Sequence, residues 1–277
     1  MWINIIDYRG DDTVINTRGD SLFNYRTVYF LRQQADFHHW KTAGHKFRCF
    51  TQHNDNNFSE FDDVVKIPRG NAASSRNQVL DFYLKDEWIG VWDNDATLYF
   101  DKLESRRFIQ ELDAVCQQAK SQDITAFVPF NAQQSPYPIN PKPAWTFKPK
   151  LEQKGTMIFL EVGDWRFDES MDALEDLEFA CRLSLQGHKF AQCEQVSLKE
   201  MVHGKSTIFQ VNEHHKAYKK PGPGASPNGL KQWDAQIDRT EKYKKNMDYI
   251  ESKLGYTVKE LRDKHKAVWT KAKSMKE

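Results

Sequence analysis

The sequence has no apolar run long enough to cross a lipid bilayer. Its longest apolar stretches are short, such as TMIFLEV at residues 156 to 162, whereas a membrane-spanning helix needs about 20 apolar residues. The start, MWINIIDYRGDD, has no basic region before its apolar residues and turns acidic at once, unlike a secretory signal peptide. These absences predict a cytoplasmic protein without a membrane partner.

Cysteine is scarce and scattered. Cys49, Cys116, Cys181 and Cys193 form no C-x-x-C pair, which disfavours both a disulfide framework and a zinc site. Free thiols in a reducing compartment are therefore expected. Of the 277 residues, 39% are hydrophobic and 13% aromatic, enough for a sizeable core in one large domain or a domain with an appendage.

Net charge is also small, at +1, but it is unevenly distributed. Residues 212 to 277 contain 16 Lys and Arg against 9 Asp and Glu, so they carry +7 and residues 1 to 211 carry −6. A basic appendage on an acidic body is consistent with a polyanionic partner, although lysine-rich helices are commonly just solvated. We therefore expect a main domain over residues 1–211 and a basic loop with a C-terminal helical extension over residues 212–277.

Strands and helices alternate along the first half of the chain. Apolar or alternating runs predict strands at residues 2 to 6, 46 to 51, 62 to 68, 88 to 93 and 124 to 130. Helical spacing predicts helices over residues 21 to 44, with Gly44 as the stop, 70 to 85 and 102 to 121. This alternation predicts an α/β sandwich with a mainly parallel sheet, in which ligands bind beyond the carboxyl ends of the strands.

Two segments rich in proline or glycine interrupt the pattern. Residues 131 to 149 contain five of the ten prolines, which predicts a long irregular excursion. KPGPGASPNG, residues 220 to 229, predicts a linker before a helical region in which TVKE, Thr257 to Glu260, matches a capping box.

An aspartate pair ends the most apolar predicted strand. In WIGVWDNDATLYF, residues 88 to 100, Asp93 and Asp95 are two positions apart, so on an extended strand their side chains point the same way. Such oxygen ligands favour Mg²⁺ or Mn²⁺ and the phosphates that the cation bridges. Surface turns often contain D-x-D as well, but carboxylates beside a buried run are costly without a cation. The pattern therefore predicts a metal site.

One family with this pattern is the haloacid-dehalogenase-type phosphatases. DNDATL resembles their D-x-D-x-T, with Asp93 as the nucleophile and Asp95 as the general acid, and VGDWRFD, with Gly163, Asp164 and Asp168, resembles their later metal motif. Their motif strand usually opens the domain, whereas here it begins at residue 88, and ITAFVPFN lacks the Ser or Thr expected after the following strand. This phosphatase interpretation is kept as an alternative.

An ordered set of motifs resembles the GT-A glycosyltransferases, whose D-x-D holds a metal bound to a nucleotide-sugar diphosphate. ASSRNQVL, with Arg76 and Asn77, resembles the A-R-N-x-x-L helix beside the donor. Residues 167 to 190, FDESMDALEDLEFACRLSLQGHKF, resemble the acceptor-side segment with its acidic E-D, and MVHGKST places His203 like the late metal-ligating histidine. The resemblance covers residues 1 to 210 and implies a Rossmann-like α/β/α sandwich of GT-A type.

The resemblance also implies a metal and donor site. Asp93, Asp95 and His203 would hold Mn²⁺ or Mg²⁺, which neutralises the charge on the departing diphosphate of a UDP-sugar. Lys205 would reach phosphate oxygens, and Arg76 would lie beside the donor.

Tyr8 and Arg9 follow the first predicted strand, where the nucleotide base tends to lie in this family, so Tyr8 is predicted to stack on uracil. Trp165 and Arg166, just before the acidic helix, are predicted to pack on an acceptor ring. Exposed aromatic residues often have only packing roles, and that alternative remains for Tyr8 and Trp165.

Glu175 and Asp176 lie in the first turns of an amphipathic helix expected to begin near Ser170 or Asp172. The positive end of the helix dipole keeps a carboxylate ionised there. The resemblance to the GT-A acceptor-side segment then implies that Asp176 is the general base for the acceptor hydroxyl, with Glu175 beside it. Acids at this position also commonly serve only to stabilise the helix. A base-assisted single displacement implies inversion at the anomeric carbon, although retaining members of the family carry similar acids.

The acceptor and the sugar are less defined. Nothing in the sequence names the sugar; UDP-glucose is the first expectation and a pentose donor the alternative. HKAYKKPGPGASPNGLKQW interleaves lysines with aromatic residues, which suits DNA phosphates. A GT-A enzyme without an anchor and with such a tail resembles bacteriophage enzymes that glycosylate hydroxymethylcytosine in DNA or extend a sugar already there, in the host cytoplasm.

Two other interpretations stay open. One is a hexosyl- or pentosyltransferase that acts on a surface glycan. The other is a GT-A-like domain that has lost activity and serves as a binding module, against which the intact D-x-D and LED argue. The oligomeric state is not indicated.

Overall fold

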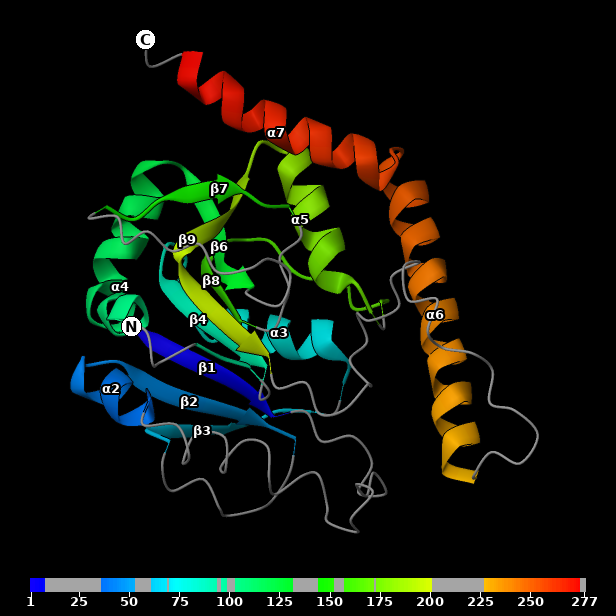
Figure 1. Ribbon diagram of the computed structural model, residues 1–277, viewed down its shortest axis with the longest axis horizontal. Helices are drawn as coiled ribbons and strands as arrows, with labels where there is room; N and C mark the ends of the chain where they lie inside the picture. Colours follow the sequence, from blue (N-terminus) through cyan, green and yellow to red (C-terminus); the bar gives the residue numbers. More distant parts are fainter. Residues whose placement is uncertain are drawn as a thin grey trace.

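The computed structural model describes residues 1–7, 36–52, 61–68, 70–93, 96–98, 103–131, 144–151, 157–171, 173–200 and 227–274. Its elements, in chain order, are β1 (Trp2–Asp7), α2 (Asp36–Thr42), β2 (Lys46–Thr51), β3 (Asp63–Lys66), α3 (Ala72–Asp81), β4 (Trp88–Asp93), β5 (Ala96–Leu98), α4 (Leu103–Ser121), β6 (Ile124–Asn131), β7 (Phe147–Pro149), β8 (Met157–Glu161), α5 (Glu175–Leu185), β9 (Lys189–Glu200), α6 (Pro227–Leu254) and α7 (Val258–Ser274) (Figure 1).

All these strands belong to one mixed sheet. Its order is β3-β2-β1-β4-β8-β6-β9-β5, and β7 pairs with β9 outside this path. Strands β1, β2, β3, β4, β6 and β9 run in one direction, whereas β5, β7 and β8 run in the other. The predicted α/β class with a mixed, mainly parallel sheet is therefore confirmed.

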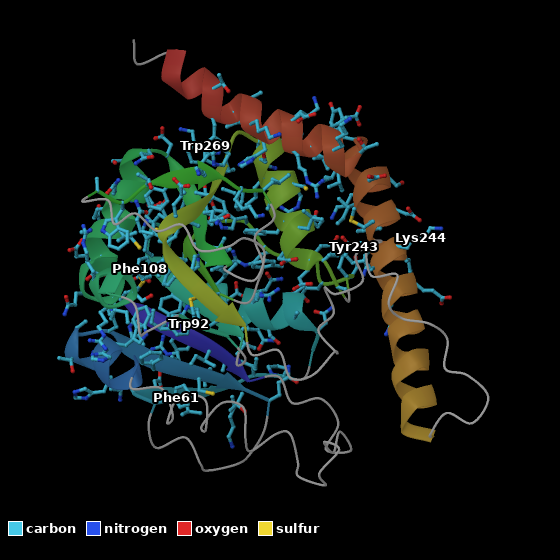
Figure 2. All side chains as sticks on the ribbon, in the orientation of Figure 1. Phe61, Trp92, Phe108, Tyr243, Lys244 and Trp269 are labelled. Carbon is cyan, nitrogen blue, oxygen red and sulfur yellow. The ribbon has the colours of Figure 1, made fainter. Side chains whose placement is uncertain are left out.

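Alternate strand residues face two separate hydrophobic layers. Ile3 and Ile5 of β1 pack into one layer, together with Trp92 of β4 and Phe108 of α4 (Figure 2). Ile6 packs into the other layer, to which α3, α5, α6 and α7 contribute. Because successive strand side chains point to opposite faces, one sheet serves two cores. Helices cover both faces, which confirms the predicted α/β/α sandwich with a C-terminal helical extension (Figure 1).

Several local predictions can be compared with the described residues. Gly44 ends α2 with a left-handed φ of 84°, as expected of a glycine stop, while most of the predicted helix over residues 21 to 44 lies outside the described part of the chain. The predicted irregular stretch at residues 131 to 149 contains the end of β6 and all of β7, which is a correction. The four cysteines are buried free thiols, as predicted. No helix in the described part of the chain is long and apolar enough to span a membrane.

The C-terminal extension begins with α6 at Pro227 and turns into α7 at Gly255, where φ is 72°. The predicted capping box is confirmed: Glu260 Oε2 accepts from the Thr257 backbone N at 2.7 Å, and the Glu260 backbone N donates to Thr257 Oγ1 at 3.3 Å. Val258 and Leu261 of α7 are buried in the layer that contains α5. The helix therefore docks onto the body through its apolar side.

A buried histidine joins α7 to the start of β9. The His265 side chain is 1% exposed, and its Nε2 accepts from the Phe190 backbone N at 3.2 Å. Trp269 Nε1 lies 3.2 Å from the same nitrogen. A nitrogen that accepts these bonds carries no proton, so the folded protein holds the neutral imidazole. Burial lowers the pKa of His265 to about 4.

Acidification is expected to weaken the folded state through this histidine. An unfolded histidine titrates near pH 6.5, so the unfolded chain binds the proton first and stability falls by about 3 kcal/mol as pH drops from about 6.5 to about 4. In His265→Gln, an amide oxygen can accept the Phe190 bond and does not titrate. Urea unfolding at pH 7 and pH 4 should show the wild type losing about 3 kcal/mol more than this variant. Equal losses in both proteins would contradict the assignment.

Candidate active site

The parallel strands β1, β2 and β4 end side by side on one edge of the sheet. Asp7 pairs with Thr51, the last residue of β2, and Ile6 pairs with Asp93, the last residue of β4. The predicted strand that ends in the D-x-D pair is therefore confirmed, and it lies between β1 and β8. Asp95 lies outside the described residues, as do Tyr8 and Arg9, which follow β1 directly.

Strand β9, the last strand along the chain, ends beside this aspartate pair. Glu200, at the end of β9, pairs with Ala96, the residue after Asp95. His203 and Lys205 follow Glu200 by three and five residues and lie outside the described part of the chain. The two chain segments that carry the predicted metal ligands thus start from paired backbone positions.

Helix α3 begins at the same edge. Gln52, the first residue after β2, donates from Nε2 to Ser75 Oγ at 3.2 Å. Asn71 caps the helix with its side-chain oxygen, and its Nδ2 donates to the carbonyls of Glu169 at 2.7 Å and Met171 at 2.9 Å. The start of α3 therefore holds the segment that leads into α5.

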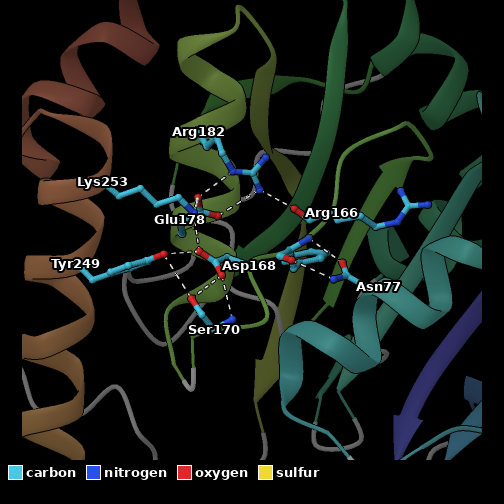
Figure 3. Close-up of polar contacts among 9 residues, drawn as sticks. Asn77, Arg166, Asp168, Ser170, Glu178, Arg182, Tyr249 and Lys253 are labelled. Atoms are coloured by element: carbon cyan, nitrogen blue, oxygen red, sulfur yellow. Dashed lines mark hydrogen bonds and ion pairs between the residues drawn. The ribbon is translucent and has the colours of Figure 1, made fainter.

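Asn77 of the R-N motif holds the same segment. Its Oδ1 accepts from the Phe167 backbone N at 2.7 Å, and its Nδ2 donates to the Phe167 carbonyl at 3.0 Å (Figure 3). The same Nδ2 donates to Glu169 Oε1 at 2.7 Å. The sequence interpretation gave Asn77 no separate role. A buried asparagine in a helix signals such a bond, because its amide must be satisfied, but the sequence does not reveal the partner.

Arg76 and Glu175 form a buried ion pair. Arg76 is 3% exposed and Glu175 is 7% exposed, and Arg76 Nη1 donates to Glu175 Oε1. Glu175 is the first residue of α5. The structure thus brings together a residue predicted on the donor side and one predicted beside the general base. Their separate catalytic and donor-binding roles remain predictions.

Helix α5 begins later than predicted. It starts at Glu175 instead of near Ser170 or Asp172. The Asp168 carboxylate accepts from the Ser170 backbone N at 2.9 Å and from Ser170 Oγ at 2.7 Å, which fixes a turn that competes with helix.

Leu174, just before the helix, has a left-handed backbone with φ 60° and ψ 19°. A bulky residue with this φ is uncommon and costs on the order of 1–2 kcal/mol. Such strain clusters at functional sites.

Asp176 is the second residue of α5 and is half-buried. Its Oδ1 accepts from the Leu177 backbone N at 2.8 Å. Glu175, Asp176 and Glu178 all lie in the first turn, so the predicted first-turn position of the acids is confirmed. The positive end of the helix dipole stabilises the ionised form of carboxylates there.

Trp165 and Arg166 lie near the other end of α3. Arg166 Nε donates at 2.8 Å to Asp81, the last residue of α3, roughly 14 Å along the helix from its start. The Trp165 ring packs edge-on against His188, just before β9, with centroids 4.9 Å apart. Their acceptor role remains a prediction.

The acids of the alternative phosphatase motif are bound to lysines. Asp164 pairs with Lys85 on the surface, and Asp168 pairs with Lys253 of α6. Within the described ranges, no group of three or more His, Cys, Asp or Glu side chains is arranged to hold a metal ion.

No protein-family model matches the chain, and a search of curated proteins finds no match either. Solved structures with a similar fold include S. aureus TarS 1–349 in complex with UDP, at TM-score 0.45 and 10% identity over 71% of this chain and 59% of that one. The mannosyltransferase PcManGT from Pyrobaculum calidifontis, in complex with GDP-Man and Mn²⁺, gives a TM-score of 0.45 and 13% identity, over 75% of this chain and 58% of that one.

GalNAc-T7 with UDP, GalNAc and Mn²⁺ gives TM-score 0.42 and 9% identity over 72% of this chain and 43% of that one. The chain thus spans less than two thirds of each of these proteins. At these identities and TM-scores, the likeness is one of overall architecture alone.

Proposed function

We propose that the protein is a metal-dependent glycosyltransferase that moves a sugar from a UDP-sugar to a hydroxyl acceptor. The observation that carries the proposal is the edge of the sheet at which β4 ends with Asp93 beside the end of β1, and to which β9 returns with Glu200 opposite Ala96. Ligands of parallel α/β sheets bind beyond such carboxyl ends.

Chain connectivity supports a shared cation site for Asp95 and His203. Asp95 directly precedes Ala96, and His203 follows Glu200 by three positions, which limits the Glu200–His203 Cα distance to about 11 Å. Carboxylates and imidazole both suit Mn²⁺, and carboxylates suit Mg²⁺. Bound there with Asp93, either ion would neutralise charge on the departing diphosphate. Tyr8 and Arg9, at the end of β1, and Lys205 are proposed to contact the donor.

Asp176 is the proposed general base. The Glu175 carboxylate is buried and already accepts from Arg76, so we assign this pair to fixing the start of α5. Asp176 is half-buried at the positive end of that helix. It takes the proton of the acceptor hydroxyl as that oxygen bonds to the anomeric carbon and the bond to the diphosphate breaks. A single displacement of this kind inverts the configuration.

The position of α7 favours a saccharide acceptor, such as a surface glycan, over DNA. The basic surplus of the extension is largest in α7, with six Lys and Arg against two Asp and Glu, compared with six against five in α6. His265 ties α7 to Phe190 at the start of β9, whereas Glu200, at the far end of that strand, lies beside the proposed site. Hydroxymethylcytosine in DNA is therefore the alternative acceptor.

Mass spectrometry after incubation with UDP-sugars and Mn²⁺ tests both parts of the proposal. A hexose or pentose added to a simple saccharide is expected, with neither plain DNA nor hydroxymethylated DNA gaining mass. Sugar added only to hydroxymethylated DNA would reverse the acceptor assignment. Failure to transfer or hydrolyse any nucleotide-sugar would contradict the glycosyltransferase proposal, and phosphate release from a simple phosphomonoester would favour the phosphatase.

A further inference from the structure

Where α6 lies against α5, four side chains form a charged cluster, which we call the Lys253 clamp: Asp168, Glu178, Tyr249 and Lys253 (Figure 3). The Lys253 ammonium lies 2.5 Å from Asp168 Oδ2 and 2.9 Å from Glu178 Oε1. Tyr249 donates its hydroxyl to Asp168 Oδ2 at 2.9 Å. One cation of the C-terminal extension therefore joins two acids of the main domain.

The clamp is partly buried, and Arg182 supplies the second cation that balances its two acids. Glu178 has a side chain that is 0% exposed, and it also accepts from Arg182 Nε at 2.8 Å. A carboxylate so deeply buried is costly unless cations contact it. Partial burial alone would raise the pKa of Asp168, but bonds from Lys253, Ser170 and Tyr249 hold it well below its usual range. Burial likewise opposes the charge of Lys253, yet its two acid partners raise its pKa.

The two acids flank the start of α5. Asp168 lies in the turn before the helix, and Glu178 lies in the first turn, two residues after Asp176. Lys253 therefore connects the chain on either side of the strained Leu174. Arg182 adds a parallel connection, because it donates to the Arg166 carbonyl at 2.6 Å as well as to Glu178.

Helix α3 holds this same segment from the other side. Asn77 binds Phe167 (Figure 3). It also binds Glu169, and Arg76 binds Glu175. With α3 on one side and α6 on the other, the start of α5 is fixed from two directions. A left-handed leucine persists only where its surroundings impose it, which is what these contacts provide.

We propose that Lys253 is a positioning residue through which the C-terminal extension fixes the first turn of α5 and thereby the carboxylate of Asp176. The kinetic part of this inference rests on the proposed function, whereas the structural part does not. The extension is accordingly a working part of the site and not a separate appendage.

Hydrogen exchange tests the structural part. Lys253→Met removes the ammonium but keeps an unbranched stem, Lys253→Arg keeps a cation, and Lys244→Met is a matched control on α6, where Lys244 projects away from the body (Figure 2). Peptides covering residues 166 to 178 should exchange about tenfold faster in Lys253→Met, and within about twofold of wild type in the other two variants. Unchanged exchange in Lys253→Met, with the wild-type circular dichroism spectrum, would contradict the inference that Lys253 fixes the start of α5.

Steady-state kinetics test the positioning role. Lys253→Met should lower kcat about 100-fold, because small misplacements of a catalytic group are costly, while KM for the UDP-sugar stays within about twofold. Lys253→Arg should recover most of kcat, and Lys244→Met should not change it. Faster exchange with wild-type kcat would overturn the positioning role. If the wild type turns over no nucleotide-sugar, the proposed function fails, and the exchange result alone decides whether Lys253 holds this segment.

Discussion

Asp176→Asn is expected to lower kcat by about 10³- to 10⁴-fold while leaving affinity for the UDP-sugar within about twofold. Asparagine has nearly the same size, and its amide oxygen can still accept the 2.8 Å bond from the Leu177 backbone N, so the start of α5 should persist. What is lost is the ability to take a proton from the acceptor hydroxyl. Turnover and equilibrium binding of the donor, measured on the same preparation, separate the two effects.

Glu175→Gln is the matched control for the neighbouring acid. It removes the negative charge of the buried ion pair and leaves the Arg76 guanidinium without it. Its main expected effect is therefore a loss of about 3 kcal/mol in the free energy of unfolding. The folded variant should keep more turnover than Asp176→Asn. Normal turnover in Asp176→Asn would refute the assignment, and a larger loss of kcat in Glu175→Gln would exchange the two roles.

Asp95→Asn is expected to lower Mn²⁺-dependent turnover at least about 100-fold and to weaken donor binding, because it removes a charged oxygen ligand of the proposed cation. Titration of activity with Mn²⁺ should show a much higher half-saturating concentration than in the wild type. EDTA should reduce the wild type to the level of the variant. Asp263→Asn, on the exposed side of α7, is the control for loss of one surface charge and should behave like the wild type. Activity that is unchanged both by EDTA and by Asp95→Asn would contradict the proposed metal site.

Strand β4 and its end could be predicted from sequence because its composition reflects burial on both faces. Ile89 and Val91 pack into one layer and Trp92 into the other, so nearly every residue is apolar up to Asp93. The acids at the start of α5 were also predictable from the helical spacing that follows them. The exact start was not, because the turn at Asp168 depends on bonds that the spacing does not reveal.

Strands β8 and β9 show why the rest of the sheet could not be predicted. The β9 pairing with β6 jumps from Cys193 opposite Pro129 to Ser197 opposite Phe130, and this irregularity disrupts the two-residue alternation that marks a strand. In β8, Met157 to Leu160 are buried on both faces like a parallel strand, so composition does not reveal that β8 runs antiparallel between β4 and β6.

Long-range pairings at the site were equally hidden from local patterns. Arg76 and Glu175 are 99 residues apart, and Asp168 and Lys253 are 85 apart. The basic charge of the extension was visible in the sequence, but its location was set by buried contacts of α7, among them the bond between His265 and Phe190. The charge counts therefore predicted a basic surface on the extension, but not how far that surface lies from the proposed active site.

The proposed cation site can be located by the anomalous signal of manganese in a crystal grown with UDP and Mn²⁺. One strong peak is expected beyond the end of β4, within bonding distance of the Asp93 and Asp95 carboxylates, the His203 imidazole and the diphosphate oxygens. UDP bound at this edge without manganese, or manganese held elsewhere in the molecule, would rule this site out.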